Sequence, residues 1–184
     1  MPDAALGAGA PLWATAAILG YVTLQRLGEL WIARRNTARL LAEGAIEVAA
    51  PHYALIVAVH AAWLILLWIF AFGQPVLTLP LVLFALVQAL RFWTLASIGR
   101  RWTTRILVKP GERLVAKGPY RFFPHPNYAV VVLEIALLPC VFGLYALAIA
   151  FSLLNAGVLA IRIPAEERAL RQHTRGRLRA SEPG

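Results

Sequence analysis

The chain is poor in the residues that build disulfides and metal clusters. Among its 184 residues there is one cysteine, Cys140, and there are four histidines. A single cysteine excludes an intramolecular disulfide and any site with several cysteine ligands. The histidines are too scattered along the sequence to form a recognisable metal-binding pattern. The sequence therefore predicts no metal site.

Acidic residues are also scarce, with 9 Asp and Glu against 18 Lys and Arg, a net charge of +9. A basic chain often binds nucleic acid. Here, however, the basic residues gather at the ends of apolar runs, as membrane topology requires, so no nucleic-acid partner is expected. The glycine-rich turn that holds cofactors in soluble enzymes is missing too. The only Gly-x-Gly, Gly7-Ala8-Gly9, precedes an apolar stretch and follows no strand.

Long apolar stretches dominate the chain, in which 60% of residues are hydrophobic. Several approach the ~20 residues that an α-helix needs to cross ~30 Å of hydrocarbon. We predict an all-α integral membrane protein with five transmembrane helices, at residues 11–33, 53–72, 76–98, 127–142 and 144–163. The last two form a hairpin around Gly143, and the fourth is short, so it is tilted or partly re-entrant. The first ten residues lack a basic n-region, so the first span is expected to stay in the mature protein.

We predict a single domain over residues 1–184. It comprises three N-terminal spans in 1–98, a region of motifs in 99–170 and a basic tail in 171–184. Residues 164–180 are too charged to span, so they are expected to form a helix along the membrane surface. Pro164 is expected to bend the chain where it leaves the membrane.

Positive charge predicts the orientation of the spans. Lys and Arg fall in the connections after the first and third spans and in the tail, and are absent from residues 1–10, from 73–75 and from the tip near Gly143. This pattern places the N-terminus outside and the C-terminus in the cytoplasm. The residues concerned are Arg34, Arg35, Arg39, Arg100, Arg101, Arg105, Lys109, Arg113, Lys117, Arg121, Arg168, Arg171, Arg175, Arg177 and Arg179.

The segment 118–128 is polar and rich in proline just before an apolar run. Gly118-Pro119 is a turn signal, and Pro124 and Pro126 disfavour helix between them. We expect Asn127 to cap the fourth span. His125 and Tyr128 would then lie at a helix entrance, which favours anionic groups. A plain interfacial loop with aromatic anchors explains the local pattern equally well.

Arg162 and Glu166 are four residues apart, so they share one face of a helix, with Glu167 beside them. An arginine that snorkels to the interface above an acidic surface pair is the simpler explanation of these residues alone.

Other polar residues lie within the spans. Arg26 and Glu29 are expected to pair with each other, while Glu134 either lines a pocket or pairs with Arg91. Gln88 and His60 are expected to form hydrogen bonds between helices.

Three motifs together resemble the isoprenylcysteine carboxyl methyltransferase family. They are Gly118-Pro119-Tyr120, His125-Pro126-Asn127-Tyr128 and Glu166-Glu167-Arg168-Ala169-Leu170, and the resemblance covers about residues 100–170. It implies a membrane enzyme that holds S-adenosylmethionine in a pocket of its C-terminal half, under a cytoplasmic loop.

The resemblance also implies roles for individual residues. Arg162 matches the arginine that faces the methyl acceptor, and is the catalytic candidate. Trp102 and Glu134 are added as candidates for binding the acceptor. The residues that match cofactor contacts are Arg105, Glu112, Leu114, Val115, Tyr120, His125, Pro126, Asn127, Tyr128 and Glu166.

Two positions depart from the family pattern. Pro124 stands where an arginine is usual, and Arg105 where eukaryotic members have a glutamine. The segment Arg101-Trp102-Thr103-Thr104-Arg105 is more similar to bacterial relatives, some of which methylate long-chain phenolic or pyrone lipids.

The expected function is S-adenosylmethionine-dependent O-methylation of a lipophilic acceptor at the inner face of a bacterial membrane. The acceptor would be an isoprenylcysteine-type carboxylate or a long-chain phenolic or pyrone lipid. Two alternatives stay open: an NADPH-dependent membrane reductase of the steroid-reductase type, and a non-enzymatic membrane scaffold.

Overall fold

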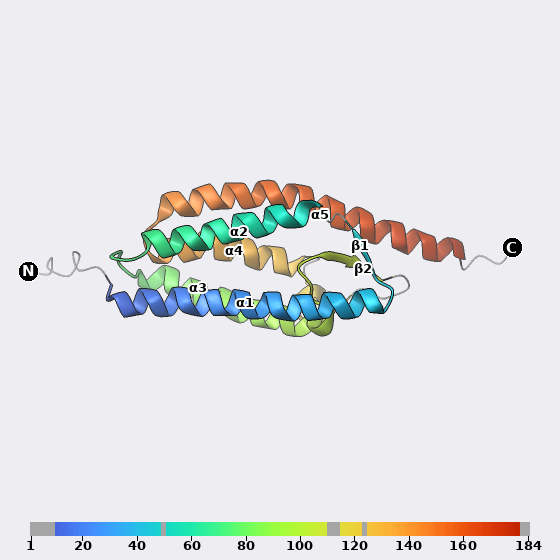
Figure 1. Ribbon diagram of the computed structural model, residues 1–184, viewed down its shortest axis with the longest axis horizontal. Helices are drawn as coiled ribbons and strands as arrows, with labels where there is room; N and C mark the ends of the chain where they lie inside the picture. The colour runs from blue at the N-terminus through green and yellow to red at the C-terminus, as the bar shows by residue number, and fades with distance from the viewer. Residues whose placement is uncertain (1–9, 49–50, 110–114, 123–124, 181–184) are drawn as a thin grey trace, which may run out of the picture.

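The described residues form five α-helices, which run up and down an elongated bundle (Figure 1). The computed structural model describes residues 10–48, 51–109, 115–122 and 125–180. Each helix reverses the direction of the one before it, so the start of α1 and the end of α5 lie at opposite ends. The helices are α1 (Leu12–Ala42), α2 (Pro51–Phe70), α3 (Thr78–Ile98), α4 (Pro126–Val141) and α5 (Tyr145–Ala180).

Among the described helices, three are long and apolar enough to cross a membrane, at Tyr53–Phe70, Thr78–Arg101 and Tyr145–Ala169. The segment Pro126–Val141 is apolar but shorter. Large apolar side chains such as Leu86 and Leu153 point outward without protein cover, which suits a surface that faces lipid. The predicted helical integral membrane protein is confirmed.

All five helices contribute to one apolar core. Its fully buried members include Leu19 of α1, Leu67 of α2 and Leu138 of α4, and it also contains Phe84 of α3 and Phe151 of α5. At one end of the bundle the backbone N–H of Leu77 donates to the carbonyl of Val141 at 2.8 Å, which ties the start of α3 to the end of α4. Gly143, at φ 68°, then makes the turn into α5.

A small β ladder joins two connections at the other end of the bundle. Strand β1 (Ile46–Val48) pairs antiparallel with β2 (Ile106–Val108), so that Ile46 lies opposite Val108. Ile106 and Val108 are buried against Ala169 of α5. The ladder was not predicted, because strands of three residues are too short to show a periodic pattern.

Two local expectations about the helix ends need correction. Residues 164–180 are helical, as predicted, but they continue α5 unbroken through Pro164 to Ala180 instead of forming a separate helix. A proline removes one backbone hydrogen bond, but the neighbouring bonds can carry the helix past it. Helix α4 begins at Pro126, with His125 at the N-cap position and no side-chain cap. Asn127 is therefore inside the helix, since proline is favoured at the first helical position.

Candidate functional site

The chain turns at Gly118 just before the residues of the candidate site. Gly118 has φ 55° and begins the short helix η2 (Gly118–Arg121). A Cβ on this residue would lie 2.0 Å from Ser97 Oγ and 2.9 Å from Ser97 Cβ. Only glycine permits both the backbone conformation and this close contact with α3. The contact brings η2, which contains Tyr120, against α3.

At the first turn of α4, the Tyr128 hydroxyl connects two charged residues of α5. It donates a hydrogen bond to the Glu166 carboxylate and accepts one from Arg162 Nε at 3.0 Å. Arg162 Nη2 donates to the carbonyl of Thr104 at 2.5 Å. These contacts stabilise a guanidinium that is only 7% exposed. Arg162 and Glu166 thus lie on one face of α5, as their spacing predicts.

Two further predicted residues gather around Tyr128 and Glu166. The His125 ring lies 5.4 Å from the Tyr128 ring, centroid to centroid, and its Nε2 is 3.8 Å from Glu167 Oε1. Burial first, and then the negative charge of Glu166, raise the pKa of Tyr120 to about 12. The Tyr120 phenol is therefore neutral at physiological pH. The Tyr128 ring thus lies against His125 and its hydroxyl binds Glu166, whose charge also acts on Tyr120.

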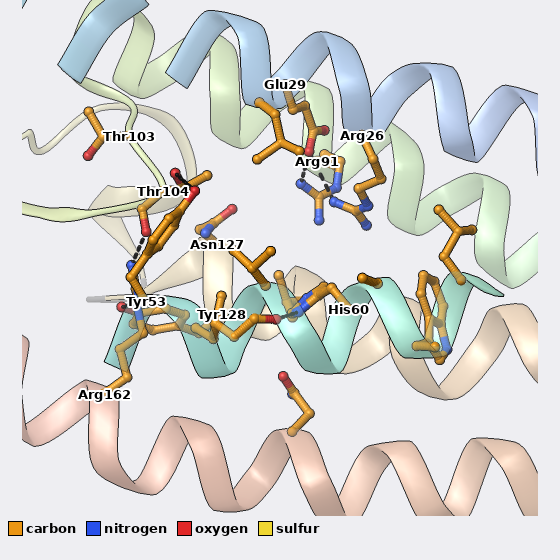
Figure 2. A pocket seen from close by; sticks show the side chains of 18 of the residues that line it. Arg26, Glu29, Tyr53, His60, Arg91, Thr103, Thr104, Asn127, Tyr128 and Arg162 are labelled. Atoms are coloured by element: carbon orange, nitrogen blue, oxygen red, sulfur yellow. Dashed lines mark hydrogen bonds and ion pairs between the residues drawn. The ribbon is translucent and has the colours of Figure 1, made fainter. Parts of the chain in front are cut away.

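A cavity of about 300 Å³ lies among all five helices and the segment after α3. Of this group, Tyr128 and Arg162 line it, whereas Tyr120, His125 and Glu166 do not. Figure 2 shows Arg162, Tyr128, Tyr53 and Thr104 together at one end of it. Most of the remaining wall is apolar, and includes Leu27, Leu30, Ile56, Val57, Ala61, Leu64, Val131 and Leu159.

Four charged side chains, Arg26, Glu29, Arg91 and Glu134, form a buried cluster beside the cavity. Arg26 donates to Glu29 at 3.0 Å and to Glu134 at 2.6 Å. Arg91 Nε donates to Glu134 Oε1 at 2.5 Å, and Arg91 Nη1 to Glu29 Oε2 at 3.0 Å. Two guanidiniums and two carboxylates make the cluster neutral overall. Arg26, Glu29 and Arg91 line the cavity, whereas Glu134 lies outside its wall.

The contacts in and around this cluster test several predictions made from the sequence. The Arg26–Glu29 pair is confirmed. Of the two alternatives for Glu134, pairing with Arg91 is the one observed. Gln88 Nε2 donates to Glu134 Oε1 at 2.8 Å, so the predicted bond between helices is also confirmed. His60 differs, because its Nδ1 is bonded to the Ile56 carbonyl of its own helix at 2.8 Å.

Three other predicted residues have definite places. Trp102 is buried in the cavity wall, and its backbone carbonyl accepts a hydrogen bond from Asn36 Nδ2 at 2.9 Å. Asn127 also lines the cavity, whereas the neighbouring Pro126 is buried. The structure does not bring Arg105 to Glu166. Arg105 pairs with Glu47 at 2.8 Å and stacks over the Tyr53 ring, 5.2 Å from its centroid.

The rest of the predicted cofactor strip is only partly visible. Val115 lies partly buried just before η2. Glu112 and Leu114, and the departure at Pro124, lie outside the described residues.

Several cavity residues were missed from sequence. Tyr53 and His60 come from α2, Thr103 and Thr104 from the approach to β2, and Asn155 from α5. Asn155 could have been identified from the sequence, because a lone amide within an apolar span is costly unless it has a polar partner. The helical spacing of Tyr53, Ile56 and His60 gave none, since most helices show such a stripe.

The sequence profile of the isoprenylcysteine carboxyl methyltransferase (ICMT) family matches residues 76–172, a segment that contains Tyr128, Arg162 and Glu166. The chain belongs to the ICMT family. Membership places it in a class of membrane methyltransferases and agrees with its apolar helices.

One relative is the Bacillus subtilis (strain 168) protein called "Uncharacterized protein YpbQ". It is 40% identical over 170 residues, which cover 85% of this chain and 96% of the relative. No solved structure matches the chain. The ICMT match begins in the connection before α3, so α1 and α2, which supply Arg26, Tyr53 and His60 to the cavity, lie outside it.

Proposed function

We propose that this ICMT-family protein transfers the methyl group of S-adenosylmethionine to an anionic oxygen of a lipophilic acceptor. The observation that carries the proposal is the Tyr128 hydroxyl, which joins Glu166 to Arg162 where an apolar cavity ends. One side of this junction offers a carboxylate and the other a guanidinium. A cationic donor and an anionic acceptor would meet across it.

The residues around Glu166 fit the cofactor. S-adenosylmethionine carries an ammonium and a sulfonium, and when bound it supplies an electrophilic methyl group. The Glu166 carboxylate suits the ammonium. The rings of Tyr120, His125 and Tyr128 offer π faces, which attract cations. We assign Asn127 and Pro126 to the same wall from their places in the matched motif.

Arg162 suits the acceptor. Its Nε and Nη2 are occupied by Tyr128 and Thr104, while Nη1 has no protein partner among the residues that the structure describes. Because Arg162 lines the cavity, this last nitrogen can donate to an anionic oxygen at the cavity end. An acceptor that is already ionised needs no general base. Arg162 then contributes by holding the oxygen in line, an effect of position rather than of proton transfer.

The proposal includes five spans, with the N-terminus outside and the site at the cytoplasmic face of a bacterial inner membrane. The alternating helices support an odd number of crossings (Figure 1). Helix α4 has 16 residues, which gives about 24 Å of rise, so it crosses less than the full hydrocarbon thickness. The end of the bundle with β1 and β2 carries Arg39, Arg100 and Lys109, as the positive-inside rule requires of a cytoplasmic face.

A thermal shift in detergent separates the functions. We expect S-adenosylhomocysteine, the demethylated product, to raise the melting temperature, and NADPH to leave it unchanged. Stabilisation by NADPH alone would favour the membrane reductase, and no effect of either ligand the scaffold. Glu166→Ala together with His125→Ala should abolish the shift by S-adenosylhomocysteine. Transfer of a labelled methyl group from S-adenosylmethionine to a long-chain phenol or a prenylcysteine then identifies the acceptor class.

A further inference from the structure

The cavity contains a second polar group of residues, away from Arg162. Asn155 precedes Arg162 by seven residues on α5, and both line the cavity. Seven residues are about two helical turns, or about 10 Å along the axis, so the two side chains share one face of the helix. Leu159 lines the wall between them. The two polar positions are therefore separated along an apolar wall.

His60 lies at a similar depth on the facing helix. Helix α2 packs against α5 and runs in the opposite direction (Figure 1). Tyr53 marks the Arg162 end, because Thr104 bonds to both: its hydroxyl donates to Tyr53 at 3.3 Å and its carbonyl accepts from Arg162. His60 is seven residues beyond Tyr53 on α2, which is again about 10 Å. Figure 2 shows His60 away from the Arg162 end, below Arg26 and Arg91.

Two atoms of this inner group have no partner. Asn155 and Trp63 are each 1% exposed and both line the cavity. Among the described residues, neither Asn155 Oδ1 nor Trp63 Nε1 has a hydrogen-bond partner. Such atoms are costly inside a bilayer, where no bulk water satisfies them. Their presence in the wall of one cavity indicates that something bound in the cavity supplies the missing bonds.

The hydrogen-bonding capacity of the group defines the ligand. Trp63 Nε1 can only donate, and Asn155 Oδ1 can only accept. His60 Nδ1 must carry a proton to bond the Ile56 carbonyl, so in the neutral ring Nε2 is a second acceptor. A carbonyl or ether would serve Trp63 alone, an ammonium would serve only the acceptors, and a hydrocarbon would serve none. A hydroxyl group accepts from Trp63 Nε1 and donates its single proton to one of the two acceptors, Asn155 Oδ1 or His60 Nε2.

The charged residues near Trp63, Asn155 and His60 favour an uncharged group on the ligand at this position. Arg26, Glu29 and Arg91 also line the cavity, but with Glu134 they form an internally paired, neutral cluster. Arg26 Nε and Glu29 Oε1 have no hydrogen-bond partner among the described residues, but the cluster has no net charge that would attract a second ionised group on the ligand.

We infer that the methyl acceptor carries a hydroxyl group on its tail, about 10 Å from the oxygen that is methylated, and that Trp63, Asn155 and His60 bind it. The inference rests on the proposed function and narrows its substrate class. It selects an oxygenated lipid over one whose tail is pure hydrocarbon, such as a prenyl chain.

The test compares three long-chain alkylphenols of equal length as acceptors. One has an unsubstituted tail, one a tail hydroxyl about 10 Å from the phenol oxygen, and one a hydroxyl at the far end of the chain. We expect kcat/KM of labelled methyl transfer to be about tenfold higher for the second than for the first, the effect of one or two buried hydrogen bonds. The difference should lie mainly in KM, and the third should show no such gain.

Substitutions then locate the effect. Asn155→Leu keeps the volume but removes the amide, and Trp63→Phe keeps a ring but removes the N–H. Each should bring the ratio of kcat/KM between the second and first phenols close to one. Thr94→Val is the matched control, because Thr94 is fully buried, its hydroxyl has no partner within the described part of the chain, and it does not line the cavity. It should leave the ratio unchanged.

Two results would overturn the inference while leaving the proposed function intact. One is an equal kcat/KM for the first and second phenols, which would mean that water satisfies the inner group. The other is a preference that survives both Asn155→Leu and Trp63→Phe, because the hydroxyl would then be recognised elsewhere. Stabilisation by S-adenosylhomocysteine without methylation of any acceptor, prenylcysteine included, would instead contradict the proposed function, and the inference would fall with it.

Discussion

Arg162 and Tyr128 belong to different helices, and Arg162 Nε donates to the Tyr128 hydroxyl at 3.0 Å. The same hydroxyl donates its own proton to Glu166. One oxygen atom thus holds the residue assigned to the acceptor and the residue assigned to the cofactor in a fixed relation. The two proposed binding sites share a wall, and this relationship makes the proposal testable by single substitutions.

The Tyr128 hydroxyl can be removed without removing its ring. Tyr128→Phe leaves Glu166 and Arg162 without their common partner, and a hydrogen bond to a charged group is worth about 1.5–3 kcal/mol. We expect kcat/KM for methyl transfer to fall roughly 10- to 100-fold, with weaker binding of S-adenosylhomocysteine in titration calorimetry. Wild-type values for both quantities would show that the bridge has no role in the reaction.

Loss of the Arg162 guanidinium should separate turnover from cofactor binding. Arg162→Ala removes the proposed donor to the acceptor anion, and loss of such a donor typically costs roughly 10²–10³-fold in rate. The S-adenosylhomocysteine thermal shift should persist, because Glu166 and the aromatic rings remain. Arg34→Ala, an exposed arginine at the same end of the bundle, serves as the control. Unchanged turnover in Arg162→Ala would remove Arg162 from the mechanism.

The buried charge cluster predicts a large effect on stability. Glu134→Gln leaves Arg26 and Arg91 with one carboxylate between them, and breaking a buried ion pair costs about 3–5 kcal/mol. We expect the melting temperature in detergent to fall by roughly 10 °C. Glu43→Gln disrupts two surface pairs, with Lys109 at 2.7 Å and with Arg39 at 3.5 Å, and should leave the melting temperature nearly unchanged. Equal melting temperatures for the two variants would contradict this view of the cluster.

Gly118 and Gly157 give a matched pair of glycine substitutions. Gly118→Ala introduces a Cβ at φ 55° and against Ser97, so we expect a loss of about 1–3 kcal/mol. Gly157 lies inside α5, and a Cβ added there would meet nothing within 4 Å. Gly157→Ala should therefore stabilise by about 0.5–1 kcal/mol through helix propensity. Thermal unfolding of both variants measures the difference, and tolerance of Gly118→Ala would show that η2 need not pack on α3 in this way.

Much of the fold followed from local pattern. The apolar runs predicted the long helices, since burial in lipid requires helical hydrogen bonding within each segment. The spacing of Arg162 and Glu166 correctly placed them on one face. The ends of the helices were less predictable. The start of α4 at Pro126 was predicted to within one residue, but Pro164, which follows the last predicted span, lies inside α5.

The candidate site was predictable only in part. The motifs identified Tyr120, His125, Tyr128 and Glu166, which the structure brings together. The motifs did not include Tyr53 or Asn155. The lone amide of Asn155 indicates a polar contact but not which one, because both residues reach the cavity only through the packing of α2 against α5.

The sequence by itself determined that this is a helical membrane protein of the ICMT family, because hydrophobic run length and motif spacing are properties of neighbouring residues. Only the tertiary structure decided what Glu134 does and what lines the cavity. Arg26, Arg91 and Glu134 come from three helices, and opposite charges attract according to their distance in space rather than along the chain.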